Sequence, residues 1–465
     1  MAAYADWQNC VGWSWALPNH YLINQPTITL MALPPLATNA TAANAAPAAQ
    51  QRLLFPFIMV TSLFFFWGFI HNLDPVLIPH LKRAFSLNAL KASLVDSAVY
   101  LGYFLMAIPA GMIMKKYGYK TGILLGLGLF AIGCFLFIPA ADTMQYVFFL
   151  GALFIVACGL AILETAANPY ATILGDPATS TQRLNFAQSF NGLAAFLAPI
   201  IGGRLILAEQ PLDATALNAM TESARALYLQ QETSTVKLPY IILGSAILVM
   251  AALFFFTKLP DIKEKDATEK AGFLHVLRHK HLAWAVVAQF FYVGAQVCIL
   301  SFLILFATKA AGITEKEASN YSGAAGLAFM VGRFAGTFFM RYLPPPRLLA
   351  YYSIACILLC LVTILGSGMI TLYANIGIAF FMSIMFPTIF ALGIKDIGAD
   401  TKPASSLIIM AIVGGAVLPP MLAYIGDATG NFQYGYVVPL ICFAVILYFG
   451  LKGHRISGPA EPVRL

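Results

Sequence analysis

Twelve long runs of apolar residues follow one another along most of the chain. They lie at about 53–79, 90–114, 120–141, 145–174, 186–208, 237–258, 282–308, 317–341, 347–367, 369–393, 404–426 and 433–452. Each run has about 20 residues or more, which is the length that a helix needs to cross the hydrocarbon core of a bilayer. The runs are continuously apolar, whereas the strands of a membrane β-barrel alternate polar and apolar residues. The pattern therefore predicts an all-α membrane protein with twelve transmembrane helices.

The composition supports this class and excludes others. Of the 465 residues, 60% are hydrophobic and 10% are charged, and the mean hydropathy of +0.79 lies above the range of water-soluble domains. The net charge of +7 requires no nucleic-acid partner, because basic loops on one side of the membrane account for it. The seven cysteines form no CxxC motif and six lie in apolar runs, so we expect small buried side chains and neither disulfides nor a metal site.

One strongly charged connection divides the twelve runs into two groups of six. We predict a disordered leader (1–50), an N-terminal six-helix bundle (51–259), a cytoplasmic central loop (260–281), a C-terminal six-helix bundle (282–453) and a cytoplasmic tail (454–465). The leader has no Lys or Arg before Arg52, so it lacks the basic start of a signal peptide. A second long connection, at 208–235, contains a helix-like stretch that we expect outside the bilayer.

The basic residues predict the orientation. With the N-terminus in the cytoplasm, 18 of the 27 Lys and Arg residues fall in inside segments and 8 in outside segments. Membrane proteins retain the basic loops on the cytoplasmic side. We therefore expect a multi-pass protein of the cell (inner) membrane with both termini in the cytoplasm.

The two groups of runs resemble each other. The segment after run two can be laid on the segment after run eight, with Gly111 over Gly336 and Lys116 over Arg341, when one extra residue is allowed in the second loop. Parallel repeats of this kind occur in secondary transporters, whose solute site lies near the midplane between the repeats. The expected architecture is two pseudo-symmetric six-helix bundles with a solute site at their interface.

Run four carries a carboxylate deep inside an apolar stretch. Glu164 lies in a segment, from about Tyr146 to Leu174, that has no other charge. An ionisable group at that depth is costly and usually serves a function. Asn168 lies one helical turn away on the same face, so we expect Glu164 to take up and release a proton while the neighbouring amide holds a polar solute. The alternative is a carboxylate that only ties two helices together.

Two more carboxylates lie within the predicted spans, and both are in the first half. Asp74 in run one has His71 and Asn72 beside it, and Asp96 lies in run two. Carboxylates confined to one half indicate that this half carries the coupled proton. For each of these residues a purely structural hydrogen bond to neighbouring groups remains the alternative.

Uncharged polar residues form faces on several runs. They include Asn185, Gln188 and Asn191 on run five, and Gln289, Tyr292 and Gln296 on run seven. Amide and phenol groups suit a sugar, whose hydroxyls donate and accept hydrogen bonds and whose C–H face stacks on rings. An anion would need a central Arg or Lys, and Arg333 and Arg204 lie near the ends of their runs. The alternative is that these amides join helices to one another.

Several of these stretches together resemble a known family. They are LETAANPYATILG (163–175), RLNFAQSFNGLAAFLAPIIGG (183–203), IPAGMIMKKYGYKTG (108–122), AQFFYVGAQ (288–296) and FPTIFALGIKDIG (386–398). The chain is similar, from about Leu54 to Gly450, to the fucose permease branch of the fucose, galactose and glucose proton symporters in the major facilitator superfamily. The resemblance implies proton coupling and sugar binding by Glu164 and Asp74, and a sugar site that includes Gln188 and Asn191.

The chain departs from the pattern of that family at two places. Helix one of the family often reads NNLND, whereas this chain reads HNLDP, so Asp74 comes one position earlier and Pro75 takes the usual place of the acid. Adjacent helical positions differ by about 100° of rotation, so Asp96 could share the role of Asp74. Met385 and Phe386 precede Pro387 where the best-known members carry more polar residues, which bears on the identity of the sugar.

These observations predict a transporter that imports a neutral hexose with a proton by alternating access. L-fucose is the expected sugar, and glucose or galactose is the alternative. We expect proton coupling by Glu164, Asp74 and Asp96, and sugar binding by Asn72, Asn168, Gln188, Asn191, Gln289, Tyr292 and Gln296. We expect Lys116, Arg183 and Arg341 to latch cytoplasmic loops. The expected partners are the sugar, the proton and the lipid bilayer, with no cofactor other than the coupling proton and with a monomeric chain.

Two other classes of protein fit the sequence less well. A membrane-embedded enzyme would need a metal cluster or a nucleophile with a paired base, and the runs show neither. A receptor or a channel would not need carboxylates that are confined to one half of the chain. Transport remains the prediction.

Overall fold

The computed structural model describes residues 40–73, 76–77, 80–81, 84–85, 94–206, 219–259 and 273–456, with side chains from residue 53 onward except at 96, 97, 203, 273, 274, 315 and 316. Residues Ala49–Leu465 form one compact unit, and everything that follows concerns this unit. Every regular element in the described part of the chain is a helix. The prediction of an all-α chain is confirmed for these residues.

The first half of the chain supplies five long helices and one shorter one. They are α1 (Ala40–His71), α4 (Leu94–Thr143), α5 (Tyr146–Ile173), α6 (Ser180–Ile206), α8 (Glu222–Ser234) and α9 (Lys237–Phe256), with the short 3-10 helix η1 (Pro177–Thr179) before α6. We refer to α1 to α9 as the N-terminal half. The helix α8 lies in the long connection where the sequence predicted a helix.

The second half, called the C-terminal half below, has more interruptions. Its helices are η2 (Phe273–Arg278), α10 (Lys280–Leu300), α11 (Leu303–Ala310), α12 (Glu315–Phe339), α13 (Pro345–Leu365), α14 (Met369–Met382), α15 (Met385–Gly393), η3 (Gly398–Asp400), α16 (Thr401–Met410), η4 (Ala411–Val413), α17 (Gly414–Thr429), η5 (Phe432–Tyr436), α18 (Val437–Tyr448) and η6 (Phe449–Gly453). Runs ten and eleven, which the sequence presents as continuous, are each divided near the middle of the membrane-spanning stretch.

The described residues contain ten helical stretches that are long and apolar enough to cross a membrane. One of them, 98–143, holds two spans, because α4 changes direction at Gly118, whose φ of 83° lies in the left-handed region. A further span, α12, is less apolar since it carries Arg333 and several glycines. Counting these together gives the twelve spans that the apolar runs predicted.

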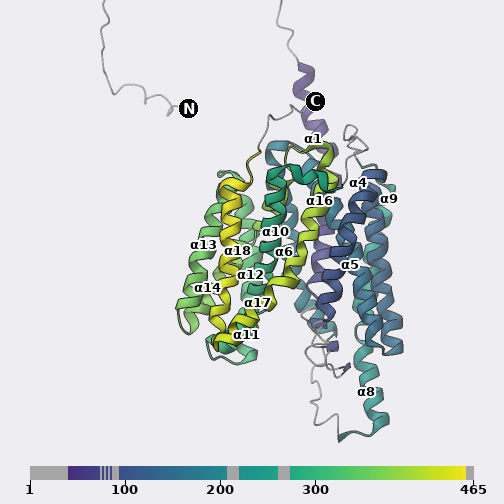
Figure 1. The fold of residues 1–465 in the computed structure, drawn as a ribbon. Helices are drawn as coiled ribbons and strands as arrows, with labels where there is room; N and C mark the ends of the chain where they lie inside the picture. Colours follow the sequence, from purple (N-terminus) through teal and green to yellow (C-terminus); the bar gives the residue numbers. More distant parts are fainter. Residues whose placement is uncertain are drawn as a thin grey trace, which may run out of the picture. The chain divides into compact units, whose positions relative to one another are not determined.

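The helices of each half pack mainly on one another (Figure 1). In the N-terminal half α4 contacts α5 and α9, and in the C-terminal half α13 contacts α14 and α18. The contacts between the halves are made chiefly by α12 against α6 and by α16 against α4 and α5. We call this set of contacts the seam. The predicted solute site requires such an interface between two bundles.

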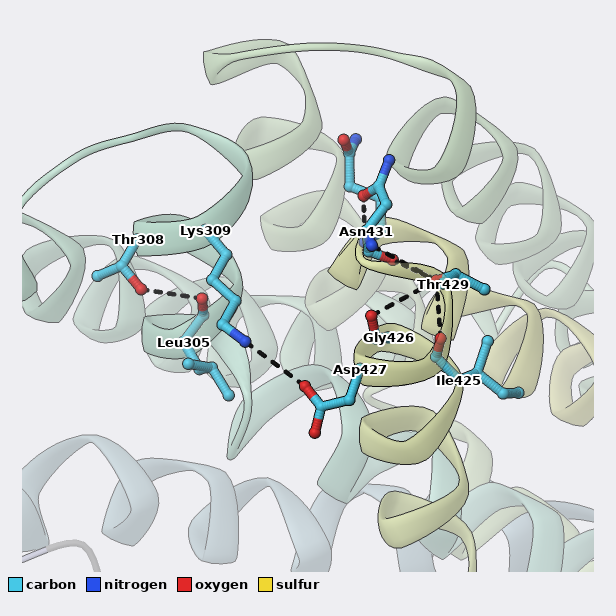
Figure 2. Close-up of polar contacts among 9 residues, drawn as sticks. Leu305, Thr308, Lys309, Ile425, Gly426, Asp427, Thr429 and Asn431 are labelled. Carbon is cyan, nitrogen blue, oxygen red and sulfur yellow. Dashed lines mark hydrogen bonds and ion pairs between the residues drawn. The ribbon is translucent and has the colours of Figure 1, made fainter.

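At one end of the C-terminal half, polar contacts hold α11 beside α17 (Figure 2). The Lys309 ammonium lies 3.7 Å from a carboxylate oxygen of Asp427, and it also lies over the Phe432 ring at 5.3 Å. The Thr429 hydroxyl donates to the Ile425 carbonyl at 2.7 Å, and Gly430 ends α17 with a φ of 67°. Here the chain turns from one membrane-spanning helix into the next.

The predicted burial of the cysteines is confirmed for the six that the structure describes. Cys134, Cys158, Cys298, Cys356, Cys360 and Cys442 are free and buried. Other predictions fall on residues outside the described part. These are Asp74 and Pro75 of run one, most of the leader, residues 260–272 of the central loop and residues 457–465 of the tail.

Candidate functional site

The Glu164 carboxylate is held between two closely packed helices. The Tyr103 hydroxyl of α4 donates a 2.6 Å hydrogen bond to Glu164 Oε1 on α5. Both side chains are buried, with Glu164 only 5% exposed. Small residues make this approach possible, since a Cβ atom at Gly102, next to Tyr103, would lie 2.7 Å from the Ala157 Cβ atom and 3.1 Å from the Phe154 carbonyl oxygen of α5. Glu164 is therefore enclosed by protein groups, and its role in proton coupling stays a prediction.

A chain of amide hydrogen bonds leads from Glu164 into α6. Asn168 Nδ2 donates to the Glu164 main-chain carbonyl at 2.9 Å, as expected for residues four apart on one helix. Gln188 Nε2 of α6 then donates to Asn168 Oδ1 at 2.9 Å. The structure therefore brings together Glu164, Asn168 and Gln188, three of the residues that the sequence singled out.

Arg333 continues this chain across the seam. Its guanidinium donates from Nη1 to the Gln188 main-chain carbonyl at 2.7 Å, and from Nε to the Ser383 carbonyl at 2.7 Å. Longer contacts join Nη1 to Gln188 Oε1 at 3.4 Å and to Asn191 Oδ1 at 3.5 Å. Arg333 is 3% exposed, so one cation deep in the protein connects the two halves.

The surroundings of Arg333 combine charge with aromatic rings. The guanidinium lies 4.6 Å from the centre of the Phe329 ring and interacts electrostatically with Tyr292 and Glu164. Tyr292 also packs edge-on against Phe386, with ring centroids 6.1 Å apart. Glu164 and Arg333 come from different halves, so ionisation of the carboxylate would change the electrostatic interaction between the halves. A charged group is only tolerated at such depth when it has partners of this kind.

Two other predicted sugar ligands lie beside this network, and two more are on α10. Asn191 packs against α1, where a Cβ atom at Gly68 would lie 2.7 Å from Asn191 Nδ2. Asn72 Nδ2 donates to the Gly68 carbonyl at 2.7 Å. Gln289 is fully buried, and neither of its amide atoms has a hydrogen-bond partner among the described residues. Gln296 is half-buried on the same helix.

The other two predicted carboxylates cannot be placed in the site. Asp74 lies outside the described residues, and for Asp96 the backbone is part of α4 whereas the side chain lies outside the described set. Their roles remain predictions. Among the side chains that the structure does describe, no group of three or more His, Cys, Asp and Glu residues could hold a metal ion.

The three predicted latch residues make contacts within their own halves. Arg183 donates to the Asp176 carbonyl at 2.6 Å and to the Thr179 hydroxyl at 2.7 Å, so it fastens the turn between α5 and α6. Lys116 lies over the Tyr117 ring at 5.0 Å, and the Arg341 guanidinium lies 5.8 Å from the Phe338 ring centre. Their effect on gating stays a prediction.

The halves meet at the end of the molecule where α6 begins. Gln182 Nε2 in the first turns of α6 donates to the Thr337 carbonyl of α12 at 3.3 Å. The Lys402 ammonium of α16 lies 5.0 Å from the centre of the Tyr119 ring of α4. Sequence reasoning did not select these residues. The seam therefore extends from this end of the helices to the level of Glu164 and Arg333.

Sequence reasoning also missed Arg333 and Tyr103. Arg333 was set aside because it lies near the end of a run, although an arginine in a membrane span is itself a signal of function. The sequence does not indicate Tyr103 as the partner of Glu164, because 61 residues separate the two in the chain. The spacing of residues along one helix does not show what a second helix presents to it.

A family model for the Major Facilitator Superfamily matches residues 57–411. The chain belongs to this superfamily. It is 41% identical to the L-fucose-proton symporter of Escherichia coli (strain K12) over 411 residues, which are 86% of this chain and 94% of the relative. It is 39% identical to a glucose/galactose transporter of Brucella abortus biovar 1 (strain 9-941) over 413 residues, 88% of this chain and 96% of the relative.

The solved structures agree with this assignment. The crystal structure of the transporter FucP in the outward conformation superposes with a TM-score of 0.81 and 40% sequence identity, covering 87% of this chain and all of that one. The predicted fold, twelve transmembrane helices in two six-helix bundles, is confirmed. The protein is a multi-pass membrane transporter of this superfamily.

Proposed function

We propose that this protein imports L-fucose together with a proton by alternating access. The membrane fold, the buried carboxylate and the amide network support this function. The 41% identity to the E. coli L-fucose-proton symporter supports the choice of sugar and of coupling ion. The proposal does not involve catalysis, a metal or an organic cofactor, because the proton gradient supplies the free energy.

The observation that carries the proposal is the link between Glu164 and the seam. When Glu164 is ionised, its charge attracts Arg333, which is bonded to Gln188 in one half and to Ser383 in the other. Protonation removes this attraction and leaves a neutral carboxyl group that is still bonded to Tyr103. The protonation state of one residue can therefore change the free energy of contact between the halves.

The sugar acts on the same network. In the structure Asn168, Gln188 and Asn191 bond to protein groups, so a bound sugar must replace some of these bonds with its own hydroxyls. Gln289, Tyr292 and Gln296 lie on α10 of the C-terminal half, and we expect them, together with Asn72 of the N-terminal half, to complete the sugar site. Sugar binding then depends on both halves, and it couples to Glu164 through the shared hydrogen bonds.

The conformation fits an outward-facing transporter. With both termini in the cytoplasm, the closed end at Gln182 and Thr337 is the cytoplasmic end. We propose this orientation in the cell (inner) membrane, with a monomer as the functional unit. Asp74 and Asp96 would relay the proton from outside to Glu164, and Lys116, Arg183 and Arg341 would order the cytoplasmic loops.

Uptake by purified protein in liposomes tests the function. We expect labelled L-fucose to accumulate when the outside is made acidic, and an uncoupler to abolish the accumulation while leaving fucose exchange in place. Accumulation that the uncoupler does not affect would contradict proton symport. Absence of any fucose movement would contradict the choice of sugar.

A second candidate is proton symport of glucose or galactose. The 39% identity to the Brucella glucose/galactose transporter is close to that of the fucose symporter, and Phe386 brings an apolar ring next to Tyr292. A competition panel separates the two candidates. If D-galactose or D-glucose displaces labelled L-fucose at a lower concentration than L-fucose itself, this second function replaces the first.

A further inference from the structure

One hydrogen bond between side chains crosses the seam one helical turn from Gln188. Asn185 Nδ2 of α6 donates to the Thr388 hydroxyl of α15 at 3.2 Å, and also to the Thr181 carbonyl of its own helix at 2.9 Å. Both side chains have no exposed surface. This contact lies between the solute network and the closed end, so it must break when that end opens.

The contact leaves one strong acceptor without a partner. Asn185 Oδ1 is buried and has no hydrogen bond among the described residues. The Thr388 hydroxyl cannot donate to it in this arrangement, because it already donates to the Ile384 carbonyl at 2.6 Å. The Thr388 hydroxyl therefore acts only as an acceptor toward Asn185. The bond that it accepts is long, at 3.2 Å, and comes from an amide group that also donates to the Thr181 carbonyl.

A buried acceptor without a hydrogen bond destabilises a structure by more free energy than one neutral hydrogen bond contributes to its stability. In the open seam, water can reach Asn185 Oδ1 and satisfy it, while Nδ2 keeps its bond to Thr181. Asn185 therefore favours opening on balance, although it makes a bond across the closed seam. A transporter needs its two states to be close in free energy, so that sugar and proton binding can change their populations.

We propose that Asn185 is a destabilising residue of the closed seam, whose unpaired carbonyl oxygen keeps the cytoplasmic end able to open. This inference rests on the alternating access proposed above, but not on the identity of the sugar. It predicts effects of opposite sign for the two residues of one hydrogen bond. Asn185→Leu removes the unpaired oxygen and should favour closure, whereas Thr388→Val removes only the acceptor across the seam and should favour opening.

The chain offers a matched control in Asn375. It is fully buried, its Oδ1 also has no hydrogen-bond partner in the described part of the chain, and its Nδ2 donates to the Tyr436 hydroxyl. Asn375 and Tyr436 both lie in the C-terminal half, on α14 and η5. Asn375→Leu is therefore the same chemical change at the same burial, but within one half.

The test is a distance measurement on the full chain in nanodiscs. Nitroxide labels at Ala178 and Tyr342, both exposed, report the separation of the beginning of α6 from the end of α12 by double electron–electron resonance. The ratio of the population with the closed distance to the population with the open distance is measured at the pH and sugar concentration at which the unsubstituted chain shows both populations.

We expect Asn185→Leu to raise the ratio of closed to open about tenfold and Thr388→Val to lower it about threefold, the range that one unsatisfied group and one weak bond imply. Asn375→Leu should leave the ratio within about twofold of its original value. An unchanged or lowered ratio in Asn185→Leu, an equal rise in Asn375→Leu, or a single distance under every condition would overturn the proposal. Because the readout is a conformation, loss of fucose transport alone would contradict the proposed function and not this inference.

Discussion

Arg333 of α12 donates a 2.7 Å hydrogen bond to the main-chain carbonyl of Gln188 of α6, across the seam between the two halves. Because the carbonyl belongs to the backbone, no substitution at Gln188 removes this bond. The same guanidinium bonds to the Ser383 carbonyl and interacts with the charge of Glu164. One buried cation thus connects the two halves to the carboxylate that we propose to bind the proton.

Replacing Glu164 by Gln should separate exchange from accumulation. The amide keeps the size of the side chain and can still accept the bond from Tyr103, but it cannot ionise. We expect fucose accumulation in proteoliposomes to fall at least about tenfold while equilibrium exchange is retained. The exposed residue Glu222 on α8 provides the control, and Glu222→Gln should behave as the unsubstituted protein does. Normal accumulation in Glu164→Gln would remove this residue from the coupling mechanism.

We expect Arg333→Lys to impair transport, although a lysine preserves the positive charge. A lysine ammonium lacks the planar set of donors that reaches both Gln188 and Ser383, and its charge is more strongly hydrated. Loss of a hydrogen bond to a charged group costs about 1.5–3 kcal/mol, so we expect the initial uptake rate of Arg333→Lys to fall about tenfold or more. Arg204→Lys, at an exposed site on α6, is the matched control. Equal rates for the two variants would contradict the role of Arg333.

We expect substitution of Gln289 to stabilise the protein and at the same time to weaken sugar binding. Its two amide atoms are buried and have no hydrogen-bond partner among the residues that the structure describes, so Gln289→Met should raise the free energy of unfolding by about 1–2 kcal/mol in a thermal melt. The same change removes groups that can bond to sugar hydroxyls, and we expect the KM for fucose to rise about tenfold. Gln230→Met on the exposed side of α8 should change neither quantity. A stabilised variant with an unchanged KM would remove Gln289 from the sugar site.

The packing of α4 on α5 can be tested without any transport assay. A methyl group at Gly159 would meet the main chain of α4 at 2.6 Å, so Gly159→Ala should push the helices apart and destabilise the protein by about 1–3 kcal/mol. Gly128 lies on α4 with nothing within 4 Å of the position of a Cβ atom. Gly128→Ala should therefore raise stability by about 0.5–1 kcal/mol. A loss of stability in both variants would argue against the close contact.

Most of the fold could be predicted from the sequence because membrane spans are long and their apolar runs are local features. The divisions of α14 from α15 and of α16 from α17 were not predicted, although Pro387, which has no N–H to bond the Ser383 carbonyl, and Gly414 beside the second break disfavour a continuous helix. A close tertiary contact also occurs at the second break. A Cβ atom at Gly414 would lie 2.0 Å from the Phe290 carbonyl oxygen, a contact with another helix.

The candidate site was predictable in part. Glu164, Asn168 and Gln188 stood out because polar groups in an apolar run are costly, and the structure joins them in one network. The bond from Tyr103 and the bridge through Arg333 depend on which faces of distant helices meet. That information is a property of the packed bundle, and helical spacing within one run does not contain it.

The most direct measurement of the coupling mechanism is the proton flux that fucose evokes. A pH-sensitive dye trapped in proteoliposomes should report acidification of the lumen when L-fucose is added outside the unsubstituted protein. With Glu164→Gln, fucose should exchange across the membrane without any change of the dye signal. Equal acidification by both proteins would contradict the assignment of the transported proton to Glu164.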